Sequence, residues 1–160
     1  RISSEPAFHR SRHVLETAMK TAQAVCNYAL LQFLPYPETG EFANVGVLVA
    51  CLEPCVLEFE AETTMPARVK AMFPRQDEHV YGAAMQAFIH EMKRVQEMAS
   101  GPKACQQAFG ECVRRRESLF RFGEVRTILS NEPAHLAVDL LRRFVRFESP
   151  RMREPSAIAA

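Results

Sequence analysis

Two strongly apolar runs separated by a polar connector constrain this chain more than any other feature. The block YALLQFLPYPETGEFANVGVLV occupies residues 28–49, with apolar runs at 28–34 and 45–52. Apolar runs rich in β-branched and aromatic residues and bounded by Pro, Gly and Asn are typical of strands. Because both runs are apolar on both faces, we expect two neighbouring strands inside a sheet that is covered on both sides.

The rest of the chain predicts a strand-rich first half and a helix-rich second half. Residues 56–61 alternate between apolar and acidic side chains, which predicts a half-exposed third strand near an edge. Residues 119–129 have extended character, with Gly123 at a bulge or turn. Apolar spacing, Pro and Gly predict helices over 66–73, 78–99, 102–115 and 131–147. This order favours an α+β fold, a small and mostly antiparallel sheet with helices packed on it.

Length and composition indicate one domain. The chain has 160 residues, of which 48% are hydrophobic and 24% are charged, a balance typical of a globular domain with its own core. No apolar stretch is long enough to span a membrane. We expect a non-native or disordered extension at residues 1–18, a single domain at 19–148 and a flexible tail at 149–160.

The five cysteines have an odd count and irregular spacing, so we expect free thiols in a reducing cytoplasm. Cys105 and Cys112 share the apolar face of a predicted helix, where cysteine behaves as a small hydrophobic residue. No set of cysteines and histidines has the spacing of a zinc site, so no metal and no cofactor are expected.

The charges are unevenly distributed. Residues 29–67 contain no Lys or Arg but several Glu, whereas arginines are concentrated between residues 111 and 153. The two regions can complement each other within the fold, which we favour, or can present separate faces to different partners.

The connector contains a Glu41-x-x-Asn44-x-Gly46 pattern at the entry to the second strand. An architectural interpretation is favoured, in which Asn44 bonds the loop backbone and Gly46 permits a bulge or close approach. Pro35, Pro37 and Gly40 shape the same connector as part of this structural motif. A functional interpretation makes Glu41 a base or metal ligand and Asn44 a substrate anchor, but one carboxylate and one amide are few for either chemistry.

A second candidate surface comes from the arginine-rich region. Phosphates can be contacted by the consecutive Arg114, Arg115 and Arg116 together with Arg121 and Arg126. Phe120 and Phe122 alternate with arginine as in proteins that stack bases. Alternation also buries the phenylalanines and solvates the arginines, which is the commoner case. The sequence lacks the motifs of dinucleotide-binding, nucleotide triphosphatase, serine hydrolase and zinc protease families, and no catalytic residue is assigned.

The blocks YALLQFLPYPETGEFANVGVLV and RFGEVRTILSNEPAHLAVDLLRRFV resemble a family of short bacterial proteins that is defined only as a domain of unknown function. The resemblance extends from about residue 27 to residue 147. Members often begin near the first strand, which implies that Met19 is the natural start. The family supplies no reaction, so the resemblance assigns no catalytic residue.

Two functions stay open at this point. The first is a small cytoplasmic accessory module that binds another protein without catalysis, indicated by the missing catalytic motifs and the charge asymmetry. The second is nucleic-acid binding or processing at a cleft formed by Glu41, Asn44, Arg121 and Arg126. No membrane partner is expected.

Overall fold

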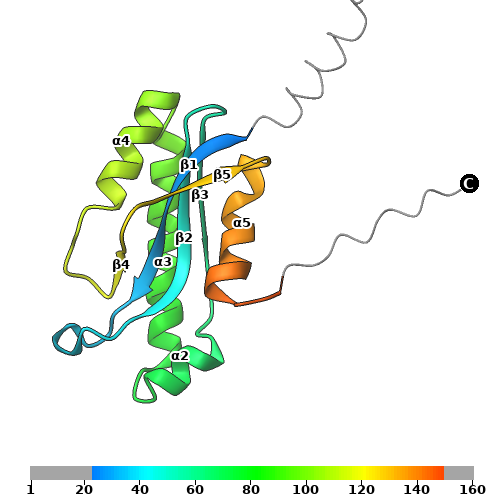
Figure 1. The fold of residues 1–160 in the computed structure, drawn as a ribbon. Coiled ribbons are helices and arrows are strands. Elements are labelled where there is room, and N and C mark those ends of the chain that lie inside the picture. The colour runs from blue at the N-terminus through cyan, green and yellow to red at the C-terminus, as the bar shows by residue number, and fades with distance from the viewer. Residues whose placement is uncertain (1–22, 150–160) are drawn as a thin grey trace, which may run out of the picture.

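The computed structural model describes residues 23–149 as an antiparallel sheet with helices on both faces (Figure 1). The extension expected at residues 1–18 and nearly all of the expected tail lie outside these residues. The sheet has the order β3-β2-β1-β4, and β5 pairs with β1 beside β4. The strands are β1 (Ala24–Phe33), β2 (Ala43–Cys51), β3 (Val56–Ala61), β4 (Phe120–Phe122) and β5 (Arg126–Ser130).

The predicted α+β class is confirmed, and so is the interior position of the two apolar strands. β1 lies between β2 and the β4–β5 edge, and β2 lies between β1 and β3. Both strands contribute buried side chains to both faces of the sheet, which explains why neither alternates in polarity. β3 is an edge strand, as its alternating pattern predicts.

One face of the sheet is covered by the helices of the middle of the chain, which are α2 (Ala67–Met72), α3 (Glu78–Met98) and α4 (Pro102–Cys112). α3 begins where Asp77 accepts hydrogen bonds from the backbone N–H groups of His79 and Val80, at 2.7 and 3.2 Å. These bonds satisfy donors that the first turn of a helix leaves free. α4 begins at Pro102 after Gly101 and ends earlier than the sequence predicts.

The core on this face is rich in aromatic residues. Phe33 of β1 packs with its ring centroid 5.2 Å from Tyr81 of α3 and 5.6 Å from Phe120 of β4. Phe88 packs against Phe120 and Phe122 at 5.8 and 5.9 Å. These contacts join α3, β1 and β4 although the sequence separates them widely, and buried aromatic pairs stabilise such packing beyond their buried area.

The opposite face is covered by the last helical segment. The sequence predicts one helix over 131–147, but the segment is divided into a 3-10 turn η2 (Pro133–His135), α5 (Leu136–Leu140) and a π-helical turn η3 (Leu141–Val145). In η3 the Arg146 N–H donates to the Leu141 carbonyl, an i to i+5 bond. The apolar face of the segment packs on β1 and β2 through Leu136, Ala137, Leu140, Leu141 and Val145.

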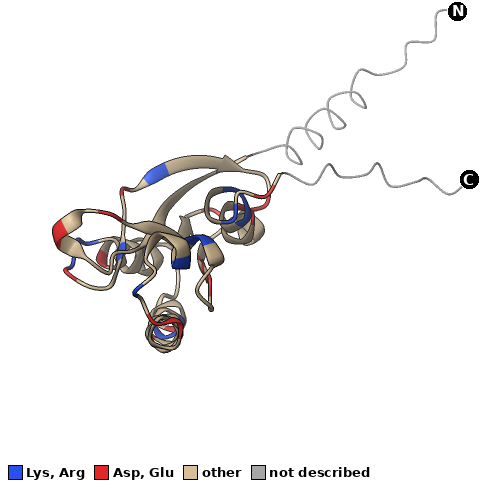
Figure 2. Cartoon of the chain, turned by 90° about the horizontal axis from the view of Figure 1, so that it is seen from below, with Lys and Arg blue, Asp and Glu red and all other residues tan. Residues whose placement is uncertain are grey.

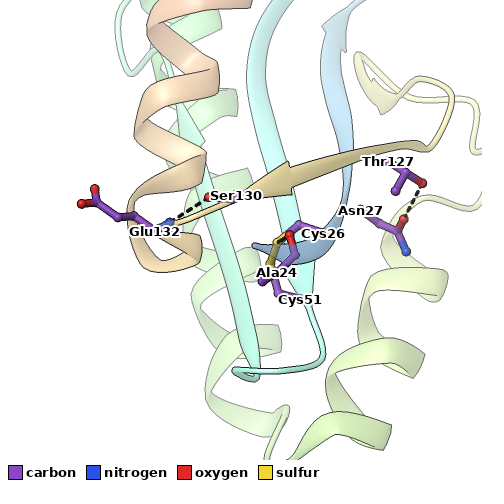
Figure 3. The surroundings of a disulfide bond; sticks show 7 residues. All are labelled: Ala24, Cys26, Asn27, Cys51, Thr127, Ser130 and Glu132. Atoms are coloured by element: carbon purple, nitrogen blue, oxygen red, sulfur yellow. Dashed lines mark hydrogen bonds between the residues drawn. A yellow bond between two sulfur atoms is a disulfide. The ribbon is translucent and has the colours of Figure 1, made fainter. Parts of the chain in front are cut away.

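Cys26 and Cys51 form a disulfide, so the prediction that all five thiols are free is wrong for these two. They are direct cross-strand partners in β1 and β2, with Cα atoms 4.5 Å apart and sulfur atoms 2.04 Å apart (Figure 3). Their spacing in sequence gives no sign of this pairing because the register of the two strands creates it. Both residues are buried beneath α5.

Candidate functional site

A hollow of about 590 Å³ lies on the α5 side of the sheet, beside the β4–β5 edge. Its floor consists of Tyr28, Leu30 and Gln32, alternate residues of β1 that point to the same face. The remaining lining residues come from the start of β2, the segment after α4 and the β4–β5 edge: Phe42, Asn44, Val113, Arg115, Arg121, Phe122, Gly123, Glu124 and Arg126.

One inserted residue at the sheet edge brings Arg121 and Arg126 to the same face. β4 and β5 pair with β1 as two parts of one edge strand, with Phe122 opposite Leu31 and Arg126 opposite Tyr28. Three residues of the edge strand therefore face two of β1, which is a β-bulge. In an unbroken strand, residues 121 and 126 would point to opposite faces, because side chains alternate.

A second bulge orients Asn44. The pairing of β2 with β1 shifts between Leu31 and Gln32, so that Gly46 faces Leu31 while Asn44 faces Gln32. Val45 is the additional residue and is fully buried on the α3 side. Asn44 consequently points to the α5 side, with Gln32.

Gly46, beside the second bulge, permits the close approach of β3. A Cβ atom at this position would lie 2.9 Å from the Glu60 carbonyl oxygen and 3.0 Å from the Cβ atom of Ala61. A side chain at residue 46 would therefore crowd β3 at the point where β2 bulges.

Arg121 is held by a neutral partner. Its Nε–H donates to Oε1 of Gln32 on the adjacent strand at 3.2 Å. Gly123 leaves space for that amide, because a Cβ atom on residue 123 would lie 2.6 Å from Nε2 of Gln32. The guanidinium is therefore oriented without a carboxylate to neutralise its charge.

The hollow is basic. Arg115, Arg121 and Arg126 line it together with one carboxylate, Glu124. Arg126 approaches Glu124 only to 3.8 Å, and both side chains are largely exposed, so this ion pair neutralises little charge. In the part of the chain that the structure describes, neither Arg115 nor Arg121 forms an ion pair with a carboxylate. Figure 2 shows that acidic and basic segments are otherwise interspersed around the molecule.

Asn44 presents an unusual amide. Its Oδ1 is screened from solvent and accepts no hydrogen bond from any residue between 23 and 149, although buried acceptors are nearly always paired. The backbone of the same residue is anchored, because the Arg68 guanidinium donates to its carbonyl oxygen. Arg68 in turn lies over the ring of Phe147, 5.6 Å from its centroid.

Of the connector residues singled out from the sequence, Asn44 alone is among the residues that line the hollow. Glu41 is exposed on the loop and does not line the hollow; its backbone N–H donates to Oγ1 of Thr39 at 3.1 Å. Gly40 has a φ of 71° and ends the 3-10 turn η1 (Pro37–Thr39). Pro35 and Pro37 line a second hollow of about 480 Å³, which shares Arg115 and Arg121 with the first and adds Arg116.

The lining of the hollow offers cationic side chains to an anion. Among residues 23–149 there is no group of three His, Cys, Asp or Glu side chains placed to hold a metal ion. The lining residues include no Ser, Cys, Lys or His, and the side chains among them that can act as a general acid or base are Glu124 and Tyr28. Phe120 and Phe122 are 5% and 8% exposed because they face α3, so they are unavailable to stack on bases.

Gln32 was not singled out from the sequence, and Arg115 was named only as one of three consecutive arginines. Gln32 is the one polar residue in the first apolar run, which is a signal that could have identified it. Arg115 belongs to a run of three arginines, and only the path of the chain after α4 determines that it lines both hollows, whereas Arg114 pairs with Glu111.

The family model described as "Protein of unknown function (DUF3037)" matches residues 28–145. The chain belongs to this family. The matched DUF3037 region begins at the Tyr28 floor of the hollow and ends at Val145 in η3, so it contains every lining residue and most of both cores. The resemblance inferred from the sequence is confirmed.

No curated protein and no solved structure shows significant similarity to the chain. Within residues 23–149, no helix is both long enough and apolar enough to cross a membrane.

Proposed function

We propose that this chain is a non-catalytic binding module that holds an acidic segment of a partner protein in the arginine-lined hollow. The observation that carries the proposal is that Arg115, Arg121 and Arg126 line one hollow in which Glu124 is the only carboxylate among the described lining residues. Guanidinium groups bind carboxylates through paired, charge-assisted hydrogen bonds. A volume of about 590 Å³ suits a few side chains of a ligand.

An acidic peptide fits this hollow better than a nucleic acid does. The burial of Phe120 and Phe122 removes the stacking platform that a single-stranded nucleic acid would use. Phe42, 40% exposed at the margin, offers an apolar contact to a peptide side chain.

The bulge in the edge strand favours binding through side chains over the addition of a strand. Strand addition needs an uninterrupted row of backbone N–H and C=O groups along a sheet edge. The three residues between Phe122 and Arg126 interrupt that row, and bulges are a common means of preventing edge pairing. The arginine side chains of this edge, and not its backbone, therefore form the recognition surface.

The test compares two anionic probes of equal charge on the full chain. Fluorescence anisotropy measures the binding of a short Glu-rich peptide and of single-stranded oligo-dT at the same low salt concentration. We expect the peptide to bind more tightly, and Arg121→Gln to weaken peptide binding about tenfold, the effect of losing one charge-assisted hydrogen bond. Arg94→Gln is the matched control, because Arg94 is an exposed arginine on α3 that pairs only with Glu91 among residues 23–149.

Three outcomes would contradict the proposal. Tighter binding of oligo-dT, lost in Arg121→Gln, would indicate the nucleic-acid function instead. Equal losses in Arg121→Gln and Arg94→Gln would indicate non-specific attraction to net charge. Absence of binding by both probes at low salt would show that the hollow is not an anion site.

A bacterial source and a cytoplasmic site of action remain predictions. The cytoplasmic prediction depends on free thiols, and the Cys26–Cys51 disulfide weakens it because disulfides are rare in cytosolic proteins. Fractionation of cells that produce the tagged full chain would test the compartment directly.

A further inference from the structure

A second pair of cysteines lies on the side of the molecule where the turn between β2 and β3 meets α4. Cys55 is exposed in the turn, and Cys105 lies in the first turn of α4 with 3% exposure. Their sulfur atoms are 2.8 Å apart although 50 residues separate them in sequence. Closing a disulfide needs the two sulfur atoms to approach by less than about 1 Å.

The two thiols are not part of a metal site among the described residues. Within residues 23–149, no third His, Cys, Asp or Glu side chain joins the two thiols to form a metal site. Sγ of Cys105 also lies 3.6 Å from the carbonyl oxygen of Ala99, which fixes its position at the start of α4. The third free thiol, Cys112, is half-buried at the end of α4 and makes no contact with either sulfur that the structure records.

We propose that Cys55 and Cys105 are a reversible redox pair whose disulfide fastens the β2–β3 turn to the first turn of α4. The proposal is independent of the anion-binding function. It differs from the Cys26–Cys51 disulfide in access: both sulfurs of that bond are buried, whereas one member of the second pair is exposed to solvent. Exposed disulfides are the ones that small thiols and disulfides can reach and exchange.

The oxidant in the proposed reaction is a low-molecular-weight disulfide such as oxidised glutathione. The Cys55 thiolate attacks one sulfur of that disulfide, which breaks its S–S bond, forms a mixed disulfide on Cys55 and releases one thiolate. Cys105 then loses its proton to the released thiolate, and its sulfur attacks Sγ of Cys55. The Cys55–Cys105 bond forms and a second small thiolate leaves, so two protein thiols lose two electrons and one small disulfide gains them.

The geometry assigns the order of these steps. A bulky disulfide can reach Cys55 but not Cys105, because Cys105 is almost completely covered. Burial, with the hydrogen bond and charge of Cys55 adding to it, raises the pKa of Cys105 to about 11, so this residue is a protonated thiol at neutral pH. Cys55 therefore attacks the small disulfide first. Cys105 then attacks Sγ of Cys55 and resolves the mixed disulfide.

The bond would stabilise a lightly anchored helix. α4 has 11 residues, of which only Cys105 and Phe109 are buried. A covalent link at its first turn would join it to the sheet and reduce local opening of its backbone. The amide protons of α4 should consequently exchange more slowly in the oxidised protein than in the reduced protein.

The experiment uses the full chain, reduced under native conditions and then equilibrated with glutathione buffers of increasing oxidised fraction. Free thiols are blocked by alkylation, and a chymotryptic digest is analysed by mass spectrometry, since cleavage after Leu52 and Phe109 separates the relevant cysteines. We expect free thiols, alkylated after unfolding the quenched protein, to fall from three to one per chain, with Cys55 linked to Cys105 and Cys112 alkylated. Reduced glutathione should reverse the change.

Two variants keep the proposal falsifiable. Cys112→Ser should leave the linkage intact, and Cys55→Ser, an exposed substitution that the fold tolerates, should abolish it and leave Cys105 unlinked. Alkylation of both Cys55 and Cys105 in fully oxidising buffer would overturn the proposal. A stable glutathione adduct on Cys55 without the cross-link, or a cross-link of Cys55 or Cys105 to any other cysteine, would overturn it equally.

Discussion

Arg121 and Gln32 face each other across the pairing of β4 with β1, and the guanidinium Nε–H of Arg121 donates to the amide Oε1 of Gln32 at 3.2 Å. A neutral acceptor orients the arginine and leaves its positive charge available. The hollow therefore has a fixed cation that no carboxylate of the described residues cancels.

Substitution of Gln32 should weaken anion binding without removing any charge. In Gln32→Met the guanidinium of Arg121 loses its orienting acceptor, and loss of one such hydrogen bond is worth about 1 kcal/mol, or roughly fivefold in affinity. Anisotropy titration with the Glu-rich peptide measures the change. Gln86→Met, an exposed glutamine on α3, is the control, and equal affinities of the two variants would show that Gln32 does not position Arg121.

Gly46→Ala should destabilise the protein by about 2 kcal/mol, because the new methyl group meets the backbone oxygen of Glu60, which cannot move without disturbing the sheet. Urea unfolding followed by circular dichroism gives the free energy of unfolding. Gly110→Ala is a control of opposite sign. Its Cβ meets no atom within 4 Å in α4, so it should stabilise by about 0.5 kcal/mol. A neutral Gly46→Ala would mean that the second bulge can relax.

Removal of the Cys26–Cys51 disulfide in a Cys26→Ala, Cys51→Ala double variant should lower the free energy of unfolding by about 3 kcal/mol. The bond closes a loop between residues 25 positions apart in sequence, and its absence gives the unfolded chain more freedom. Urea unfolding of the double variant and the parent, both with Cys55, Cys105 and Cys112 blocked, isolates this effect. In the folded parent, the two sulfurs should resist native-state reductant because both are buried.

The N-cap of α3 should contribute to acid unfolding. Hydrogen bonds from the backbone N–H groups of Val80 and His79 lower the pKa of Asp77 below its ordinary value of 3.8. A carboxyl whose pKa is lowered on folding stabilises the native state above its ordinary pKa, and this stabilisation is lost as the pH falls through the folded value. The free energy of unfolding should therefore fall less steeply with pH in Asp77→Asn than in the parent. The measurement runs from about pH 6 to about pH 2, which covers the titration of an Asp.

The two Asp77 variants separate charge from capping. Asp77→Asn keeps an oxygen that can accept from the first-turn N–H groups, whereas Asp77→Ala keeps none. We expect Asp77→Ala to be the less stable of the two at neutral pH. Identical pH profiles for the parent and Asp77→Asn would show that this carboxylate is not coupled to folding.

The sequence predicts most of the elements because their signals are local. Each local pattern indicates which side chains of its own element are buried. This holds for the apolar runs of β1 and β2, the alternation of β3 and the apolar stripe of α3. The end of α4 and the division of the last helix were not predictable in the same way, since the apolar spacing of residues 136–145 suits an α-helix as well as the mixed segment observed.

The candidate site was less predictable because pairing between distant strands creates it. Asn44, Arg121 and Arg126 were identified as candidates from residue type, but their common face depends on two register shifts that no local pattern reveals. Glu41 has the same residue-type signal and lies outside the hollow. The Cys26–Cys51 pairing escaped prediction for the same reason.

The bulge between β4 and β5 links the number of residues at the sheet edge to the face on which a charged side chain lies. Deleting Val125 would shorten the edge strand by one residue and leave every arginine in place. The deletion would remove the bulge but keep residue 126 opposite Tyr28, because four positions would then separate it from Arg121. An uninterrupted strand that kept Val125 would instead turn the side chain of residue 126 toward the helical layer that α4 and α3 form, and the hollow would lose a cation. In this fold, the number of residues between two strand pairings decides which way a charge points.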